Sequence, residues 1–216
     1  MKTINKFLRF LFFAVIVRVI VLIVLGLNIR HREKLPKKGP AIIVANHNSH
    51  LDTLVLMSLF PIRLLPTIQP VAAMDYFLSN PVLKWFAIKI IGILPLKRKP
   101  DHRGENILLP CYEALLNNRI LIFFPEGSRG EPEKLSNFKR GLAKISEQFP
   151  DIPITPILLH GLGKSLPKGE ALLVPFFCDV FVGDGIKWTG DRKSFMDQLE
   201  QRMQQLATEG QFSTWD

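Results

Sequence analysis

The sequence predicts an α/β domain with a largely buried central sheet flanked by helices, preceded by an N-terminal membrane helix. Three observations support this prediction. An apolar segment occupies residues 10–27, near the start of the chain. Short apolar runs follow it, and runs of that kind are typical of strands covered on both faces. Segments with helical spacing of apolar residues separate these runs, as expected for alternating strand and helix layers.

The N-terminal apolar segment has the sequence FLFFAVIVRVIVLIVLGL and is interrupted only by Arg18. As a helix it would be about 27 Å long, close to the hydrocarbon thickness of a bilayer. Its apolar residues outweigh the cost of about 3 kcal/mol for one central arginine, so we expect insertion. A cleaved signal peptide is the competing interpretation, but no small-residue cleavage site follows. We therefore expect a membrane-anchoring helix at 1–30 and a second domain at 31–216.

Basic residues flank this segment on both sides. Lys2, Lys6 and Arg9 precede it, and a heavier basic cluster follows at 30–38. The positive-inside bias then favours a membrane location with the second domain on the cytoplasmic face, which is the inner membrane if the protein is bacterial. The sequence leaves open whether the segment spans the bilayer or lies in one leaflet.

The remaining elements follow Gly39-Pro40. Strands are expected at 41–45, 70–74, 119–124, 153–159 and 171–182. Helices are expected at 51–60, 82–91, 103–117, 139–149 and 192–207. The last helix repeats apolar residues at helical spacing from Phe195 to Leu206. Pro110 lies inside the third expected helix, so that helix should be kinked or should start late.

The charge balance favours an anionic partner. Lys and Arg number 28 against 19 Asp and Glu, which gives a formal net charge of +9. A phospholipid surface, a phosphorylated substrate and a nucleic acid would all fit this charge. We do not expect nucleic acid, because no aromatic stacking platform or nucleic-acid motif accompanies the basic clusters. Cys111 and Cys178 are the only cysteines, which excludes a disulfide scaffold.

The most informative polar stretch is NHNSHLD at 46–52, between the first expected strand and the first expected helix. Ligands commonly bind at such strand ends. Asp52 could hold one imidazole nitrogen of His47 and leave the other as a base for a substrate hydroxyl. Ser49 and Asp52 also fit a helix capping box, in which the acid only satisfies backbone donors. A metal site made by His47, His50 and Asp52 lacks further ligands, so none is expected.

Two further stretches could bind phosphate. FFPEGSRG at 123–130 ends a buried strand in a turn that exposes backbone amides and offers Arg129. GILPLKRK at 92–99 follows an apolar helix, contains a short strand and ends in basic residues. Taken alone, the first could be an ordinary turn and the second a solvated charge run.

Together these stretches resemble the glycerophosphate and lysophosphatidate acyltransferases, the PlsC-like family. Four blocks of that family occur in order within residues 35 to 185. The similar positions are His47 to Asp52 for the HX4D block, Gly92 to Arg98 for a block ending in a substrate-binding arginine, Phe124 to Arg129 for F-P-E-G-T-R, and Ile152 to Ile157 for V-P-[IV]-x-P-V. Residues 138–141, FKRG, resemble a run that the family tends to place there.

The resemblance implies a mixed central sheet of the glycerol-phosphate acyltransferase type. It also implies acyl transfer from acyl-CoA or acyl carrier protein to lysophosphatidate, giving phosphatidate, with no acyl-enzyme, no cofactor and no metal. By the same resemblance His47 is the general base and Asp52 orients it. The residues implied to hold or shape the acceptor site are Arg98, Glu126, Gly127, Ser128 and Arg129. Backbone amides of 46–50 and 125–130 are candidate donors to the oxyanion.

The exact acceptor stays open between lysophosphatidate, glycerol 3-phosphate, another lysophospholipid and a lyso-ornithine lipid. Glu131 and Glu133 follow Arg129 and would weaken a phosphate site unless they point away. The expected partners are membrane phospholipid, the acyl donor and the lysophospholipid acceptor. A catalytically silent lipid-binding protein on the same scaffold is the alternative from another functional class.

Overall fold

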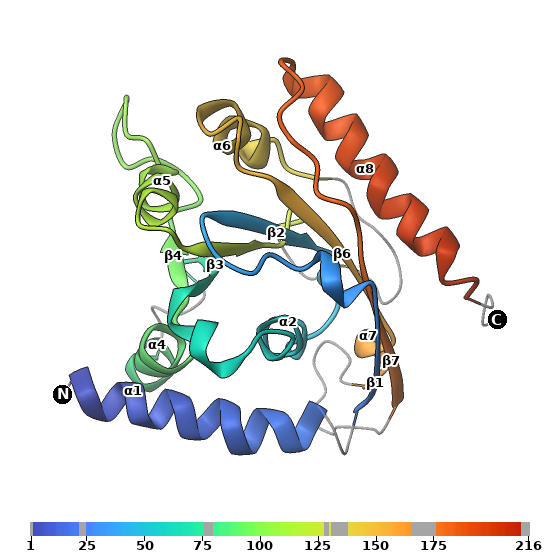
Figure 1. The fold of residues 1–216 in the computed structure, drawn as a ribbon. Coiled ribbons are helices and arrows are strands. Elements are labelled where there is room, and N and C mark those ends of the chain that lie inside the picture. The colour runs from blue at the N-terminus through green and yellow to red at the C-terminus, as the bar shows by residue number, and fades with distance from the viewer. Residues whose placement is uncertain are drawn as a thin grey trace.

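A computed structural model shows a seven-stranded sheet with helices on both faces (Figure 1). The structure describes residues 2–21, 25–75, 80–127, 130, 138–165 and 176–212. The strand order is β1-β7-β6-β2-β5-β3-β4. Neighbouring strands run parallel except for β6 and β7, which are antiparallel. The prediction of an α/β fold with a mixed central sheet is therefore confirmed.

The strands are β1 (Leu25–Arg30), β2 (Ala41–Ala45), β3 (Ile68–Ala73), β4 (Leu94–Leu96), β5 (Ile120–Phe123), β6 (Ile154–His160) and β7 (Phe176–Val182). The α-helices are α1 (Lys2–Leu11), α2 (Asp52–Ser58), α4 (Pro81–Trp85), α5 (Leu109–Leu116), α6 (Gly141–Gln148), α7 (Leu162–Ser165) and α8 (Arg192–Glu209). The π-helical segments η1 (Phe12–Val17) and η5 (Phe86–Ile91) continue α1 and α4, and the short 3-10 helices are η3 (Arg32–Lys34) and η4 (Ile62–Thr67).

Each expected strand and helix after residue 40 overlaps an element of its own type, although 171–175 of the last expected strand lie outside the described residues. The expected helix at 103–117 starts only at Leu109, with Pro110 in its first turn. A proline is tolerated there because the first helical N–H groups have no partner within the helix. The late start of this helix is therefore confirmed.

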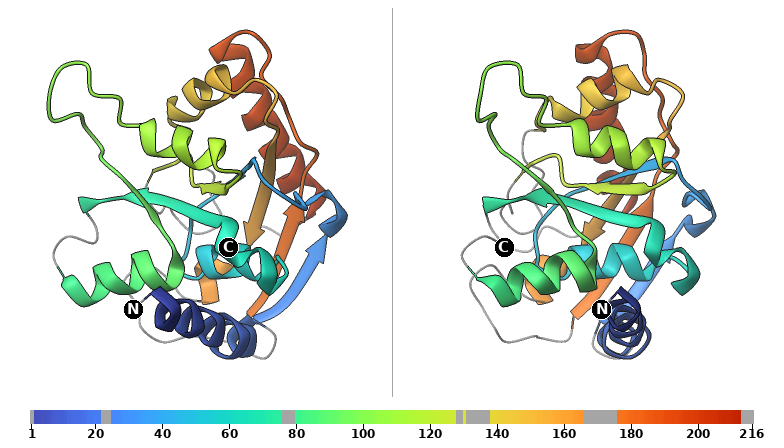
Figure 2. Two further views of the ribbon diagram at one scale, coloured as in Figure 1. Left: turned by 60° about the vertical axis from the view of Figure 1, so that its left-hand side comes forward. Right: turned by 90° about the vertical axis from the view of Figure 1, so that its left-hand side faces the viewer.

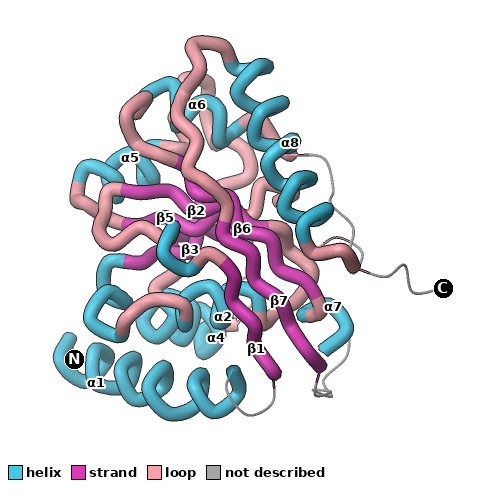
Figure 3. Tube along the Cα trace, turned by 45° about the vertical axis from the view of Figure 1, so that its right-hand side comes forward, coloured by secondary structure: helices cyan, strands magenta, loops and turns pink. Residues whose placement is uncertain are grey.

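The N-terminal apolar segment is not the single membrane helix that the sequence predicts. Within the described part of the chain, no helix is both long and apolar enough to cross a membrane. The helix formed by α1 and η1 runs beside η5 and α2 (Figure 2). From Leu25 the chain forms β1, which pairs in parallel with β7 at one edge of the sheet (Figure 3). The apolar segment thus contains a helix and a strand, and residues 22–24 between them lie outside the description.

Two apolar layers cover the two faces of the sheet. The N-terminal helix and α2 pack on one face, and α5, α6 and α8 lie on the other (Figure 1). All five residues of β2 are buried between these layers, which explains why its sequence is continuously apolar. A fully buried strand gives the loop that follows it a rigid starting point.

Candidate active site

The carboxyl ends of four parallel strands meet at one edge of the sheet. β2, β5, β3 and β4 are neighbours in that order and all point the same way. Val44 of β2 lies opposite Phe123 of β5, so the loop after β2 and the turn after β5 start side by side. Two of the stretches selected from the sequence, 46–52 and 124–127, are therefore brought together.

Asn46 fixes the start of the loop that carries His47. Its side-chain amide donates to the carbonyl of Leu159 and accepts from the amide of Leu159, both at 2.8 Å. The side chain is buried and continues the pairing of β2 with β6 by one residue. The loop therefore leaves the sheet in one defined direction.

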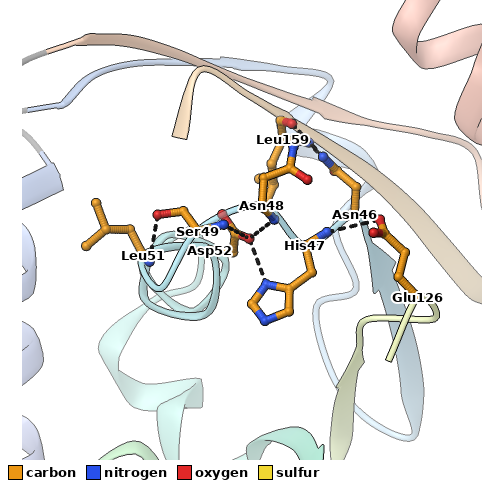
Figure 4. A network of polar contacts seen from close by, with 8 residues as sticks. All are labelled: Asn46, His47, Asn48, Ser49, Leu51, Asp52, Glu126 and Leu159. Atoms are coloured by element: carbon orange, nitrogen blue, oxygen red, sulfur yellow. Dashed lines mark hydrogen bonds and ion pairs between the residues drawn. The ribbon is translucent and has the colours of Figure 1, made fainter. Parts of the chain in front are cut away.

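His47 and Asp52 make the contact that their spacing predicts. The imidazole Nδ1 lies 2.8 Å from Asp52 Oδ2. The Asp52 side chain is fully buried, whereas the His47 side chain is 22% exposed. With Nδ1–H donating to the carboxylate, Nε2 is the nitrogen that can accept a proton. Figure 4 shows that nitrogen turned away from Asp52.

The same carboxylate oxygen also binds the backbone of the loop that precedes α2. Asp52 Oδ2 accepts hydrogen bonds from the backbone amides of Asn48, at 2.7 Å, and Ser49, at 2.8 Å (Figure 4). One oxygen therefore both orients the histidine and satisfies backbone donors of the loop, as the capping interpretation expects of the acid, while the N-cap residue of α2, Leu51, has no side-chain cap. Three donors on one buried oxygen stabilise its negative charge where water is excluded.

The turn after β5 supports the loop from the other side. Glu126 is buried, and its Oε1 accepts from the amide of His47 at 3.2 Å. The amide of Gly130 donates to the His47 carbonyl at 2.9 Å. Glu126 therefore holds the backbone of the histidine from within the protein. Ser128, Arg129, Glu131 and Glu133 lie outside the described residues.

Gly127 and Lys139 make a close approach in this turn. Gly127 has φ +73°, and a Cβ built on it would meet the Lys139 side chain. The amide of Lys139 also donates to the carbonyl of Pro125 at 2.8 Å. Lys139, in the FKRG run that resembles the family, thus lies against the turn, although the sequence pattern assigned this cation no role.

Phe124 is the second contact of the site that sequence reasoning missed. Its ring stacks on the His47 imidazole, with centroids 4.1 Å apart and planes 21° from parallel. The residue opens the F-P-E-G block, but nothing in the sequence assigns its side chain to the histidine. Its position one residue after β5 is the only signal that could have pointed to the contact.

Arg98 follows β4 at the same edge of the sheet as His47. Three inter-strand steps separate β4 from β2, which is about 14 Å. The Arg98 Nε lies 2.9 Å from an oxygen of Asp75, and both side chains are more than half exposed. The structure thus brings Arg98 to the correct edge, where it contacts Asp75, a residue that the sequence did not select.

The neighbouring Lys97 serves a different purpose. Its ammonium contacts the carboxylates of Asp101 and Glu105. The hydrogen bonds to Asp101 and then Glu105 raise the pKa of Lys97 above its ordinary value. Lys97 therefore holds the loop at 97–105, and Arg98 is the better placed of the two to meet a ligand. Within the described residues, no group of three or more His, Cys, Asp or Glu side chains could hold a metal ion.

Comparison with known proteins adds family information. The Acyltransferase family model matches residues 26–160. The chain is 33% identical over 145 residues to the chloroplastic 1-acyl-sn-glycerol-3-phosphate acyltransferase LPAT1 of Arabidopsis thaliana, an alignment that covers 67% of this chain and 38% of that protein. It is 26% identical over 161 residues to the human 1-acyl-sn-glycerol-3-phosphate acyltransferase alpha, covering 72% of this chain and 53% of the relative.

One solved structure shares the whole fold. It is the crystal structure of PlsC, the 1-acyl-sn-glycerophosphate acyltransferase from Thermotoga maritima, which superposes with a TM-score of 0.71 and covers 100% of both chains at 19% identity. At that identity the likeness establishes the fold. The chain spans about two fifths of the length of the first curated relatives it matches, with 38% and 40% of two plant proteins covered.

Proposed function

The chain belongs to the PlsC-like acyltransferase family, and on this premise we propose that it acylates the free hydroxyl of 1-acyl-glycerol 3-phosphate to give phosphatidate. The acyl donor in this proposal is acyl-CoA or acyl carrier protein. The observation that carries the proposal is the 2.8 Å contact between His47 Nδ1 and Asp52 Oδ2. The relatives named 1-acyl-sn-glycerol-3-phosphate acyltransferase support the choice of acceptor.

In the proposed reaction, His47 Nε2 accepts the proton of the acceptor hydroxyl as its oxygen attacks the thioester carbonyl. The tetrahedral intermediate then collapses, the C–S bond breaks, and the departing sulfur takes the proton back from the imidazolium. The buried Asp52 carboxylate stabilises the imidazolium between these steps. General base assistance of this kind contributes about 10²–10⁴-fold to a rate. No acyl-enzyme is needed, because the substrate hydroxyl is itself the nucleophile.

The backbone hydrogen bonds of the site reduce the number of amides that could donate to the oxyanion. Several candidate amides already donate within the protein: His47 to Glu126, Asn48 and Ser49 to Asp52, Gly127 to Phe124, and Gly130 to His47. An amide occupied in this way cannot also donate strongly to an oxyanion. We infer that the oxyanion is stabilised by groups other than these five amides.

In this proposal the phosphate of the acceptor is bound by two arginines. Arg98 and Arg129 would bind its oxygens, since a guanidinium matches phosphate geometry. Ser128 would add a hydroxyl, and Gly127 would shape the turn. Glu126 would act through the His47 backbone, to which it is hydrogen-bonded. Holding the phosphate would fix the hydroxyl near His47, which is the positional part of catalysis.

Replacing His47 by Ala tests the function. Phosphatidate formation should fall at least 100-fold, while His102→Ala, a change at an exposed histidine, should leave it near the wild-type rate. Mass spectrometry of products, with lysophosphatidate, glycerol 3-phosphate, other lysophospholipids and a lyso-ornithine lipid supplied separately, identifies the acceptor. Separate assays with acyl-CoA and acyl carrier protein identify the donor. Unchanged turnover of His47→Ala would refute the base assignment, and lysolipid binding without thioester consumption would favour the catalytically silent alternative.

We further propose that the protein associates with a membrane through one leaflet. The N-terminal helix runs beside the helix formed by α4 and η5 (Figure 2), and both helices expose large apolar side chains. The exposed apolar residues of these helices are Ile4, Phe7, Phe10, Leu11, Val15, Ile16, Val19, Val82, Leu83 and Trp85. Exposed Lys6, Arg18, Lys84 and Lys89 on the same helices suit anionic headgroups. The basic cluster at 30–38 would be attracted to the anionic cytoplasmic leaflet, so the proposed location is the cytoplasmic face, which is the inner membrane in a bacterium.

Vesicle flotation tests this surface. The double change Phe7→Glu and Val15→Glu should weaken binding to vesicles of phosphatidylglycerol and phosphatidylcholine at least 10-fold, because two exposed apolar side chains that would enter the leaflet become charged. Leu116→Glu is the matched control, since Leu116 is 71% exposed on α5, on the opposite side of the sheet. Equal losses in the double variant and in Leu116→Glu would contradict the proposal.

A further inference from the structure

We propose that Phe124 is a positioning residue for His47, holding the plane of the imidazole so that Nε2 stays aimed at the acceptor hydroxyl. The inference rests on the proposed role of His47 as general base. It concerns a residue that neither the motif spacing nor the charge of the site selects. The observation behind it is the stacking of the two rings, with centroids 4.1 Å apart and an interplanar angle of 21°.

The hydrogen bond to Asp52 restrains only part of the orientation of the histidine. It fixes the direction of Nδ1, at 2.8 Å from Asp52 Oδ2. The ring can still tilt about the line that joins these two atoms, and such a tilt moves Nε2 sideways. A flat ring against one face opposes that tilt through direct contact. Asp52 and Phe124 together therefore define both the direction and the plane of the imidazole.

Backbone hydrogen bonds and packing around Phe124 hold its ring in one position. The residue follows β5 directly, and the carbonyl of Phe124 accepts from the amide of Gly127 at 3.0 Å. The next carbonyl, that of Pro125, accepts from the amide of Lys139 at 2.8 Å. The ring also packs on the apolar layer that contains α2, the helix that carries Asp52. The two groups that orient His47 thus belong to one packed unit.

Strand alternation explains why Phe124, and not Phe123, meets the histidine. Successive side chains point to opposite faces of a sheet. Phe123 accordingly packs in the layer formed with α5, α6 and α8, and Phe124 packs in the other layer. Two adjacent phenylalanines therefore occupy opposite faces, and Phe123 supplies a matched control.

Stacking also suits the charged form of the ring. During the proposed transfer His47 becomes an imidazolium, and a cation gains from the face of an aromatic ring. Asp52 contacts His47 at Nδ1, and Glu126 contacts its backbone amide. Lys139 approaches Gly127 in the same turn. An uncharged aromatic face adds this stabilisation without a carboxylate that would compete for the proton.

The test compares Phe124→Leu, Phe124→Tyr and Phe123→Leu in the full-length protein. In Phe124→Leu, kcat should fall about 3- to 30-fold, the range expected for loss of the aromatic face, while KM for lysophosphatidate changes less than twofold. Phe124→Tyr keeps a flat ring and should retain most of kcat. Phe123→Leu changes an equally large side chain on the other face and should leave kcat near wild type. Should Phe124→Leu fail to fold, Phe124→Met removes the flat face with little change in volume.

Nuclear magnetic resonance provides a readout that does not depend on turnover. In protein labelled at histidine, the stacked phenyl ring shifts the His47 carbon-bound protons upfield, and the His47→Ala spectrum assigns them. Phe124→Leu should move these resonances toward their unstacked positions, and Phe123→Leu should not. Unchanged resonances and kcat in Phe124→Leu would overturn the inference while the function stands. A change confined to KM would also overturn it, since it would make Phe124 an acceptor contact. Full activity in His47→Ala would reject both the proposed function and this inference.

Discussion

Arg98 and Asp75 form an ion pair at the ends of two adjacent parallel strands, with Nε 2.9 Å from a carboxylate oxygen of Asp75. Asp75 follows β3 and Arg98 follows β4. An acceptor phosphate bound by Arg98 would have to share the guanidinium with this carboxylate or displace it. Because both side chains are more than half exposed, the pair should be weak enough to exchange partners.

Removing the Asp75 charge should therefore favour acceptor binding. We expect Asp75→Asn to lower KM for lysophosphatidate about 2- to 5-fold with kcat little changed, since an exposed pair contributes roughly 0–1 kcal/mol. Steady-state kinetics with varied acceptor measures this. The control is the same change in an Arg98→Gln background, where it should have no effect. A raised KM in Asp75→Asn alone would contradict the competition between Asp75 and phosphate.

Two substitutions of Asp52, by Asn and by Ala, should distinguish its contact with His47 from its hydrogen bonds to the loop amides. Asn keeps an oxygen that can accept from the Asn48 and Ser49 amides, but it no longer provides a carboxylate for His47. Asp52→Asn should therefore lose about 10²–10⁴-fold in kcat with modest loss of stability. Asp52→Ala should lose activity and also roughly 1–3 kcal/mol of stability, because buried donors lose their acceptor. Urea unfolding and turnover, measured on both variants, check this, and equal stability of the two would rule out a stabilising role for the bonds to the loop amides.

Asn46 should contribute to the stability of the fold. Its amide makes two 2.8 Å hydrogen bonds to the backbone of Leu159 in a buried position. Asn46→Ala leaves both Leu159 groups without those partners, so we expect roughly 2–4 kcal/mol of destabilisation. Chemical denaturation measures it, with Asn117→Ala as the control, because Asn117 hydrogen-bonds at the exposed end of α5. A loss below about 0.5 kcal/mol would show that the hydrogen bonds between Asn46 and Leu159 contribute little to stability.

The sequence predicted most of the fold because buried parallel strands leave long apolar runs. It failed at the N-terminus, where one hydrophobic segment contains both a helix and β1. A signal was present there: Leu25, Leu27 and Ile29 face the core, and the residues between them are exposed. That alternation has the period of a strand. The prediction missed it because the average apolarity of the whole segment resembled that of a membrane helix.

The candidate site was predictable where the partners are close in sequence. His47 and Asp52 are five residues apart, and their contact follows from a loop that leads into a helix. Asp75 lies 23 residues before Arg98, so their pairing depends on the order of β3 and β4 in the sheet. Phe124 illustrates a third kind of failure, since only the strand register decides which of two adjacent phenylalanines faces the histidine.

Gly127 should not tolerate a side chain. Its φ of +73° disfavours any other residue, and a Cβ there would meet Lys139. Gly127→Ala should lose about 1–2 kcal/mol from the backbone strain and more from the displaced lysine. Gly104→Ala is a matched control, because Gly104 has φ +94° with open space around its Cβ position. Melting of the two variants measures the difference, and equal losses would mean that the contact with Lys139 is of no consequence.

Cys111 should be inert in the native protein. The residue lies on α5 with its side chain fully buried toward the sheet, and burial raises the pKa of its thiol to about 12. At pH 8 only about one thiol in ten thousand would then be ionised, and the thiolate is the reactive form. N-ethylmaleimide should therefore label Cys111 only after unfolding in guanidinium, as measured by peptide mass spectrometry. Rapid labelling of Cys111 in the native protein at pH 8 would contradict this burial.

The same raised pKa has a consequence for stability above pH 9. The unfolded thiol ionises at its ordinary pKa, whereas the folded thiol keeps its proton up to about pH 12. The unfolded state then binds fewer protons, so this residue lowers the stability of the fold as pH rises from about 9 toward 12. Replacing Cys111 by Ala removes that dependence. The stability gap between wild type and Cys111→Ala, measured by urea unfolding, should therefore shrink as pH rises from 8 to 10.5, and a constant gap would contradict the assigned cause.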